Sequence, residues 1–327
     1  MRKIRPWLLV ATLFLACAPA APILAQSESY PSRAVRMISD SAPGSSPDVA
    51  LRIVAEAMSQ RWGQQVVVVN YPGASGALSA RAAADATPDG YTLYSPALST
   101  FLTLPGRAPN LPLMLPRDFI PIGFLFDQPM SIGASPKLGI NTLPELIALA
   151  KKKPGELSYS VAGVGRVTHL TGETLQILAD IKLQMVPYTG GAAQALSDVV
   201  TGRIPLIIEG YAAMAGVYQA GTLKAIAVGS AQRLTDAPQI PTMAETLPGF
   251  VAAGWAVMVA PLGTPKSIVD RVSADLREIL TEPDVVSRLQ ARGSFPRAMT
   301  AAETEAFVAD QQKLWKPAME RIADQMK

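Results

Sequence analysis

The sequence predicts an α/β protein built from two doubly wound units that face each other across a cleft. Short β-branched runs alternate with helical stretches in two separate series. Strands in both series end in glycine-rich or polar turns that lead into helices, which is where open α/β sheets bind ligands. The chain has 327 residues, 49% of them hydrophobic, which is enough for two hydrophobic cores.

The first 25 residues form a separate segment. Basic residues within the first five positions precede a short apolar run, Trp7 to Ala16, and small residues and prolines continue to Ala25. This pattern is typical of a secretory signal peptide, and the run is too short to span a membrane. We expect cleavage after Ala25, with Ala20 as the alternative, and a location in a bacterial periplasm.

Charge and cysteine content exclude several classes of function. Without residues 1–25, Lys plus Arg falls from 29 to 26, equal to the 26 Asp plus Glu, so the mature charge is about zero. With no Lys/Arg run either, we expect no nucleic-acid partner. Cys17, the only cysteine, lies in the leader, so the mature chain has no disulfide and no cysteine metal site. Lipid attachment at Cys17 is an alternative that Phe14 and Leu15 disfavour.

The first series begins with a strand, Val35 to Ser39, and a loop, Asp40 to Asp48. Ser46 is a suitable N-cap and Pro47 a suitable first residue for the helix that follows. Gln65 to Val69 is a continuous β-branched run, typical of a strand buried on both faces of a parallel sheet. The turn Asn70 to Gly76, an Ala-rich helix and the strand Tyr91 to Ser95 complete this unit.

The second series follows a Pro-rich segment, Leu104 to Pro121, and two apolar runs, Ile120 to Phe126 and Met130 to Ala134, that we expect to be crossing strands. Thr142 to Glu145 has the sequence of a capping box. Four further strands and a helical tail follow. The strands are expected within Leu157–Ala162, Leu183–Gly191, Ile204–Tyr211 and Leu223–Ser230, and a last strand and three helices within Trp255–Pro261, Pro265–Leu280, Pro283–Arg292 and Ala301–Ala323.

The turn after Ala162 is a candidate binding site. A single strand–glycine–helix turn is weak evidence, and its weight comes from the recurrence of such turns elsewhere in the chain. Gly163 and Gly165 separate a strand from a helix, and such a turn presents backbone N–H groups to an anion at the start of the helix. It is not a dinucleotide fingerprint, because Thr168 replaces the third glycine.

Enzyme chemistry has little support in the sequence. His169 is the only histidine and no G-x-S-x-G elbow is present, so a hydrolase would have to combine His169 with Ser160 or Ser45. We expect instead that a hydrogen bond of His169 shapes the turn from Gly163 to Thr168. Asp40, Asp48 and Glu209 are interpreted as helix caps or solvated acids at strand ends, and we expect no metal and no cofactor.

Nearly the whole mature chain resembles the tripartite tricarboxylate transporter substrate-binding proteins, the Bug receptors. The resemblance lies in the order and spacing of several short motifs. They are YPSRAVR from Tyr30, PGSSPD from Pro43, NYPGASG from Asn70, PDGYTL from Pro88, SVAGVGRVTH from Ser160, VPYTGG from Val186, LIIEG from Leu206 and APLGTPKSIVDRV from Ala260.

The resemblance implies a two-lobed type II periplasmic binding fold, a Venus flytrap. Residues 30–126 and 254–327 would form one lobe and residues 127–253 the other. It also implies a monomeric receptor, not an enzyme, that captures a small organic acid for membrane transporter subunits. The implied ligand-binding residues are Ser41, Gly44, Ser45, Ser46, Asp48, Gly73, Ala74, Ser75, Gly76, Ser99, Ser160, Gly163, Gly165, Arg166, Thr168, His169, Tyr188, Gly190, Gly191, Ala192 and Glu209.

The chain departs from the family pattern at the site. Asp40 and Ser41 replace a proline and an aromatic residue, Ser45 replaces a glycine, and Arg166 replaces a threonine. An inward Arg166 would favour a dianion, whereas an outward one would favour a monoacid, or a zwitterion held partly by Asp40 or Glu209. A receptor that only signals to a sensor kinase, the hydrolase named above and a scaffold with a degenerate cleft are the alternatives.

Overall fold

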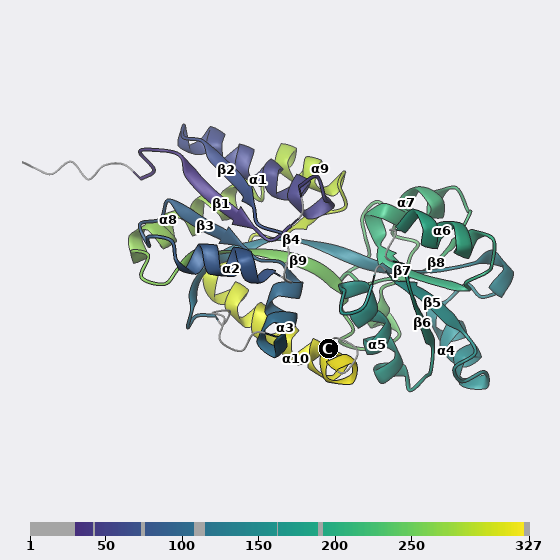
Figure 1. The fold of residues 1–327 in the computed structure, drawn as a ribbon. Helices are drawn as coiled ribbons and strands as arrows, with labels where there is room; N and C mark the ends of the chain where they lie inside the picture. The colour runs from purple at the N-terminus through teal and green to yellow at the C-terminus, as the bar shows by residue number, and fades with distance from the viewer. Residues whose placement is uncertain are drawn as a thin grey trace, which may run out of the picture.

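The computed structural model describes residues 30–41, 43–72, 76–107, 115–161, 163–188 and 192–323. The expected leader lies outside these residues. The chain folds into two lobes joined by long crossing strands (Figure 1). Within the described part of the chain, no helix is both long and apolar enough to cross a membrane.

The first lobe contains a mixed sheet in the order β2-β1-β3-β9-β4. Strand β1 is parallel to β2 and β3, whereas β9 is antiparallel to β3 and β4. Helices α1, α8 and α9 pack on one face, and α2, α3 and α10 on the other. The bounds are β1 Val35–Ser39, α1 Ser46–Trp62, β2 Val66–Asn70, α2 Ala77–Ala84, β3 Thr92–Ser95, α3 Leu98–Arg107, β9 Ala253–Pro261, α8 Lys266–Ile279, α9 Pro283–Gln290, β10 Phe295–Pro296 and α10 Ala301–Ile322.

The second lobe continues the sheet as β4-β7-β5-β6, with β8 on the other side of β4. Strands β5, β6 and β7 are parallel, and β4 is antiparallel to β7 and β8. Helices α4 and α5 pack on one face, and α6 and α7 on the other. The bounds are α4 Leu143–Lys152, β5 Ser158–Val161, α5 Val167–Ala179, β6 Gln184–Pro187, α6 Ala192–Val200, β7 Leu206–Gly210, α7 Tyr211–Gln219 and β8 Lys224–Val228, with short 3-10 turns at Pro136–Leu138 and Met243–Glu245.

One strand, β4, runs through both lobes. It spans Phe119–Ala134, so the two separate crossing strands expected from the sequence are a single element of 16 residues. Its first part pairs with β9, down to Pro129 opposite Ala253, and its last part pairs with β7 and β8. The polar stretch around Asp127 continues in extended conformation because β9 supplies backbone partners on one side and β10 on the other.

Helix α10 also reaches both lobes. A capping box at Thr300 and Glu303 starts the helix, and it packs on α3 and β4 before its last turns meet α5 (Figure 1). Trp315 is fully buried in a cluster that includes Phe101 of the first lobe and Leu170 of the second. Burial of this large aromatic side chain stabilises the contact between the lobes.

Two local expectations are wrong. Strand β2 lies at the edge of the sheet, and Val67 is 47% exposed, because a β-branched run is compatible with edge and interior positions alike. The N-cap of α1 is Ser45, so Ser46 is the first helical residue and Pro47 follows it. The Ser–Ser pair offered two adjacent cap positions, and Pro47 is acceptable in either register.

Candidate functional site

The loop between β1 and α1 is held by Asp48. Its carboxylate accepts hydrogen bonds from the Gly44 N–H (2.8 Å), Arg52 Nε (3.0 Å) and Asn70 Nδ2 (2.8 Å). Although burial opposes ionisation, the hydrogen bonds from Arg52, Asn70 and Gly44 hold the pKa of Asp48 below its usual range. Asn70 Nδ2 also donates to the Ser41 carbonyl at 2.9 Å. Asp48 is therefore a structural carboxylate that fixes the loop at the start of α1.

A side chain from the crossing strand fixes the other end of this loop. Gln128 Nε2 donates to Ser46 Oγ and to Ser294 Oγ, both at 2.9 Å. Ser45 makes no side-chain cap to α1, so the two neighbouring serines differ in role. Sequence reasoning missed Gln128 because its partners lie 82 and 166 residues away and no local motif marks it.

Asp40 lies where the first turns of α2 and α3 meet. Its carboxylate accepts hydrogen bonds from the Ala97 N–H (2.9 Å) and from the Thr100 hydroxyl. Burial raises the pKa of Asp40 in spite of these donors. A Cβ on Gly76, which has φ +91°, would overlap the same Thr100 hydroxyl. Gly76 is therefore required both for its backbone conformation and for its space.

Ser41 and Ser99 are the remaining predicted site residues of the first lobe that the structure describes. Ser99 lies in the first turn of α3 and is partly exposed, and the Ser41 N–H donates to Ser39 Oγ at 3.1 Å. Gly73, Ala74 and Ser75 lie outside the described residues.

The glycine turn of the second lobe has the predicted shape. Gly163 and Gly165 have positive φ angles of 143° and 74°, and α5 begins at Val167 with Arg166 as its N-cap. The Gly165 N–H donates to His169 Nδ1 at 3.2 Å, which confirms the expected hydrogen bond. Thr168 and His169 are buried in the first turn of α5.

Other predicted residues of this lobe have their polar atoms engaged within it. Ser160 is fully buried and its hydroxyl donates to the Leu206 carbonyl at 3.4 Å. The Tyr188 hydroxyl donates to Asp198 Oδ2 at 2.5 Å. Gly190 and Gly191 lie outside the described residues, and Ala192 begins α6.

Arg166 and Glu209 place opposite charges near each other. Arg166 is exposed, and Glu209 at the end of β7 is partly exposed. Burial raises the pKa of Glu209, opposed by a hydrogen bond from the Gly210 N–H (2.8 Å) and by the positive charge of Arg166. No carboxylate of the described residues forms an ion pair with Arg166, so its charge can interact with a ligand.

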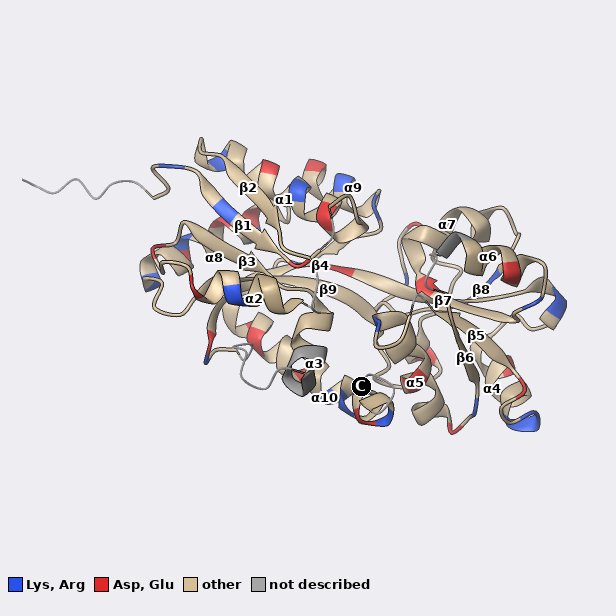
Figure 2. Cartoon of the chain, in the orientation of Figure 1, with Lys and Arg blue, Asp and Glu red and all other residues tan. Residues whose placement is uncertain are grey.

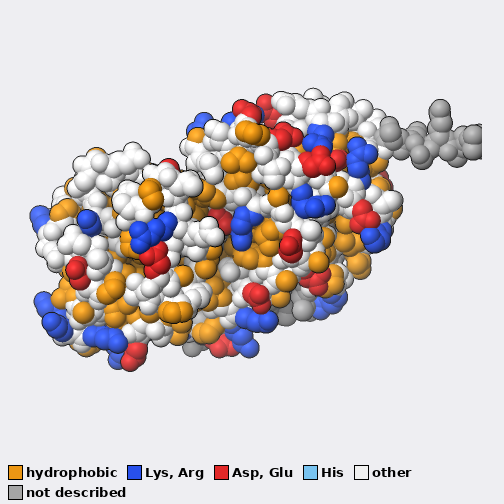
Figure 3. Space-filling view, turned by 180° about the vertical axis from the view of Figure 1, so that it is seen from behind, with side chains coloured by type: hydrophobic (Ala, Val, Ile, Leu, Met, Phe, Trp, Pro, Cys, Tyr) orange, Lys and Arg blue, Asp and Glu red, His pale blue; other side chains and the backbone are white. Residues whose placement is uncertain are grey.

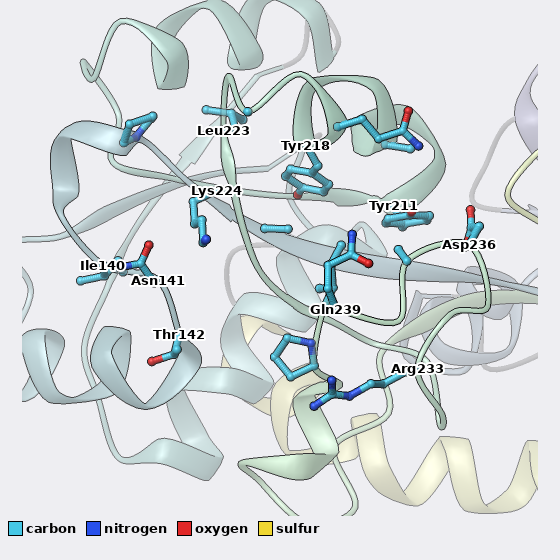
Figure 4. A pocket seen from close by; sticks show the side chains of 18 of the residues that line it. Ile140, Asn141, Thr142, Tyr211, Tyr218, Leu223, Lys224, Arg233, Asp236 and Gln239 are labelled. Carbon is cyan, nitrogen blue, oxygen red and sulfur yellow. The ribbon is translucent and has the colours of Figure 1, made fainter.

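A pocket of about 790 Å³ lies elsewhere on the second lobe. Tyr211 and Tyr218 of α7, Lys224 of β8 and Gln239 of the following loop are among its lining residues (Figure 4). None of the predicted site residues lines it. The turns at the helix starts are the candidate site, because they combine donors and charge at the ends of the parallel strands.

The surface charges are mixed. Lys, Arg, Asp and Glu are interspersed over the helices of both lobes, and the rear face shows scattered charges of both signs on each lobe (Figures 2 and 3). Among the described residues no cluster of His, Cys, Asp and Glu could hold a metal ion. His169 contacts the Gly165 N–H and Glu173, and Ser160 bonds a backbone carbonyl, so these two residues do not form a nucleophile–base pair.

Comparison with known proteins agrees with the two-lobed fold. The family model of the tripartite tricarboxylate transporter family receptor matches residues 50–323. The chain belongs to this receptor family. BugT of Bordetella pertussis is 34% identical over 311 residues, covering 94% of each chain.

Two solved structures extend the comparison. A TctC solute-binding protein from Polaromonas without ligand has a TM-score of 0.79 at 27% identity, covering 90% of this chain and 100% of that one. MatC of Rhodopseudomonas palustris with bound malate has a TM-score of 0.68 at 26% identity, covering 88% and 99%. The chain is therefore a solute-binding receptor with the two-lobed periplasmic binding fold.

Proposed function

We propose that this receptor captures a small dicarboxylate between its lobes in the periplasm and delivers it to the membrane subunits of a tripartite transporter. The observation that carries the proposal is the pair of turns at the starts of α1 and α5, one in each lobe. The first N–H groups of an α-helix have no acceptors within the helix, and the helix dipole favours an anion at this end.

We assign Arg166 as the residue that binds the second carboxylate of the ligand. A guanidinium binds a carboxylate through two parallel hydrogen bonds, and the Arg166 side chain is exposed and forms no ion pair among the described residues. Glu209 nearby would repel a ligand with excess negative charge and so favour a compact dianion over larger polyanions. The malate bound to MatC, a structural relative, is a dicarboxylate of this class.

Several properties of the receptor form part of the proposal. Cleavage after Ala25 would release a monomer that is not an enzyme. The lobes would comprise residues 30–126 with 254–327, and residues 127–253. The two proposed boundaries between the lobes lie opposite each other in the paired strands β4 and β9, where Asp127 pairs with Trp255 and Gln128 with Gly254. Helix α10, however, also packs on α5 of the second lobe.

A thermal-shift screen tests the ligand class. Mono-, di- and tricarboxylates, aromatic acids and amino acids are each added to the mature protein. A ligand at about 100 times its Kd should stabilise the fold by roughly 2.7 kcal/mol. We expect the largest shift from C4–C6 dicarboxylates, with the ligand recovered unchanged after incubation. Stabilisation by amino acids alone would overturn the dicarboxylate assignment, and consumption of the ligand would show an enzyme.

A further inference from the structure

Glu173 is a buried carboxylate at the contact between the lobes. It lies on α5, one turn after His169, and is 6% exposed. Oε1 accepts hydrogen bonds from the Tyr159 hydroxyl (3.1 Å) and Gln176 Nε2 (2.9 Å), and Oε2 pairs with Arg321 Nε at 2.9 Å. A buried carboxylate with this many donors has a fixed position and remains charged.

The pKa of Glu173 agrees with this geometry. Burial raises it, but His169, the charge of Arg321 and the Tyr159 hydroxyl together bring it below its usual range. The carboxylate is therefore ionised at neutral pH.

His169 connects this carboxylate to the binding turn. Nδ1 accepts the Gly165 N–H at 3.2 Å, so in the neutral ring the proton is on Nε2. Nε2 lies 3.6 Å from Glu173 Oε1, and this buried nitrogen has no other polar partner in the described structure. At that distance the charge of Glu173, rather than a short hydrogen bond, orients the ring.

Arg321 belongs to a helix anchored in the other lobe. Near the middle of α10, Gln311 Oε1 accepts hydrogen bonds from Trp255 Nε1 (3.2 Å) and Trp315 Nε1 (3.0 Å). Trp255 lies on β9, where it also packs against Phe101 of α3. The last turn of α10 therefore brings to Glu173 a cation whose position depends on the first lobe.

We propose that Arg321 and Glu173 are positioning residues for the ligand-binding turn, acting through His169. Arg321 fixes Glu173, Glu173 orients the His169 ring, and His169 holds the Gly165 N–H and so sets the conformation of the turn. The proposal rests on the proposed function only in assigning this turn to the ligand. Through this connection, the conformation of the turn from Gly163 to Thr168 depends on the position of helix α10.

Amide hydrogen exchange of the full mature protein, without ligand, tests the connection. Replacing Arg321 by Met should speed exchange in residues 163–170 by about tenfold, because a hydrogen-bonded charge is lost. Arg321→Lys should restore most of the protection. Lys316→Met is the matched control, since Lys316 lies on the same helix and pairs with Glu320, one turn along α10. Glu173→Gln serves as the second variant if Arg321→Met does not fold.

The decisive comparison is a double-mutant cycle. In a His169→Leu background, Arg321→Met should change amide exchange in residues 163–170 less than twofold, because the effect is proposed to pass through His169 and that side chain is absent. A tenfold effect in both backgrounds, or faster exchange confined to α10, would overturn the proposal. Malate titrations of the same variants separate the two claims. If malate and the other carboxylates fail to bind the wild type, the ligand assignment fails, while the exchange cycle still decides the connection.

Discussion

Gly293 and Ala212 bring the two lobes into direct contact. Gly293 follows α9 with φ +64°, and a Cβ added to it would overlap the Cβ of Ala212 on α7. Phe295, two residues later, packs against the apolar cluster that contains Tyr211. On this flank, the size of two small residues therefore limits how closely the lobes approach.

Enlarging Ala212 should hold the lobes apart. Ala212→Leu introduces a helix-compatible side chain at the contact without changing Gly293, whose positive φ suits glycine. We expect affinity for malate, or for the best carboxylate of the screen, to fall roughly five- to tenfold, since closure around the ligand becomes costlier. Calorimetry measures the affinity, and small-angle scattering should show a larger radius of gyration with ligand. Ala213→Leu, also exposed on α7, is the control, and equal affinities in the two variants would contradict the closure role.

The crossing strand contains a carboxyl group that should make stability pH-dependent. Burial raises the pKa of Asp127 to about 6, although Arg297 Nε lies 3.1 Å from Oδ2. Arg297 Nε makes no well-aligned hydrogen bond, so its positive charge offsets only part of the effect of burial on the pKa of Asp127. A raised carboxyl pKa means that the fold binds the proton more tightly than the unfolded chain does. The contribution of Asp127 is thus fully present below about pH 4 and is lost as pH rises through 6.

Asp127→Asn should remove this dependence. Relative to the variant, we expect the wild type to lose on the order of 2 kcal/mol of unfolding free energy between pH 4 and 7. Urea denaturation at several pH values measures the difference. Parallel stability curves for the two proteins would show that Asp127 titrates normally.

Gln128 should couple the binding loop to the crossing strand. Gln128→Leu removes the donor to Ser46 Oγ and to Ser294 Oγ, the second of which is fully buried. We expect a loss of about 1 kcal/mol in stability and several-fold weaker carboxylate binding. Gln60→Leu, on the exposed far end of α1, is the control for the general effect of this substitution. Unchanged affinity in Gln128→Leu would show that the loop is positioned without the strand.

Arg166 should discriminate between ligand classes. Arg166→Ala should weaken a dicarboxylate such as malate about tenfold or more, because a charge-assisted bond contributes roughly 1.5–3 kcal/mol. Lactate, with one carboxylate, should lose far less. Titrations of both ligands against both proteins check this. Equal losses for the two acids would mean that Arg166 contacts the shared carboxylate, and no loss for either would remove it from the site.

Local patterns predicted much of this fold. The strand–glycine–helix at Gly163 and Gly165, and the hydrogen bond that His169 accepts from the Gly165 N–H, follow from rules that operate within a few residues. The edge position of β2 and the continuity of β4 depend on which strands pair, and β-branched composition does not report that. The predicted N-cap of α1, Ser46, is one residue later than the observed N-cap, Ser45, because both residues are serines and either could cap the helix.

The candidate site was predictable only in part. Glycine turns and departures such as Arg166 are visible in the sequence. Gln128, the pair Glu173 and Arg321, and the contact of Gly293 with Ala212 join residues far apart in the chain, so no spacing marks them. The burial of Ser160 and the bond from Tyr188 to Asp198 likewise depend on tertiary packing.

The most direct test of the central claim is amide hydrogen exchange with and without a saturating carboxylate identified in the screen. The account predicts slower exchange in residues 43–50 of the first lobe and in residues 163–170 of the second lobe, together and at the same ligand concentration. Slower exchange in one lobe only, or around the pocket of Tyr211, Tyr218 and Lys224, would contradict binding between the lobes.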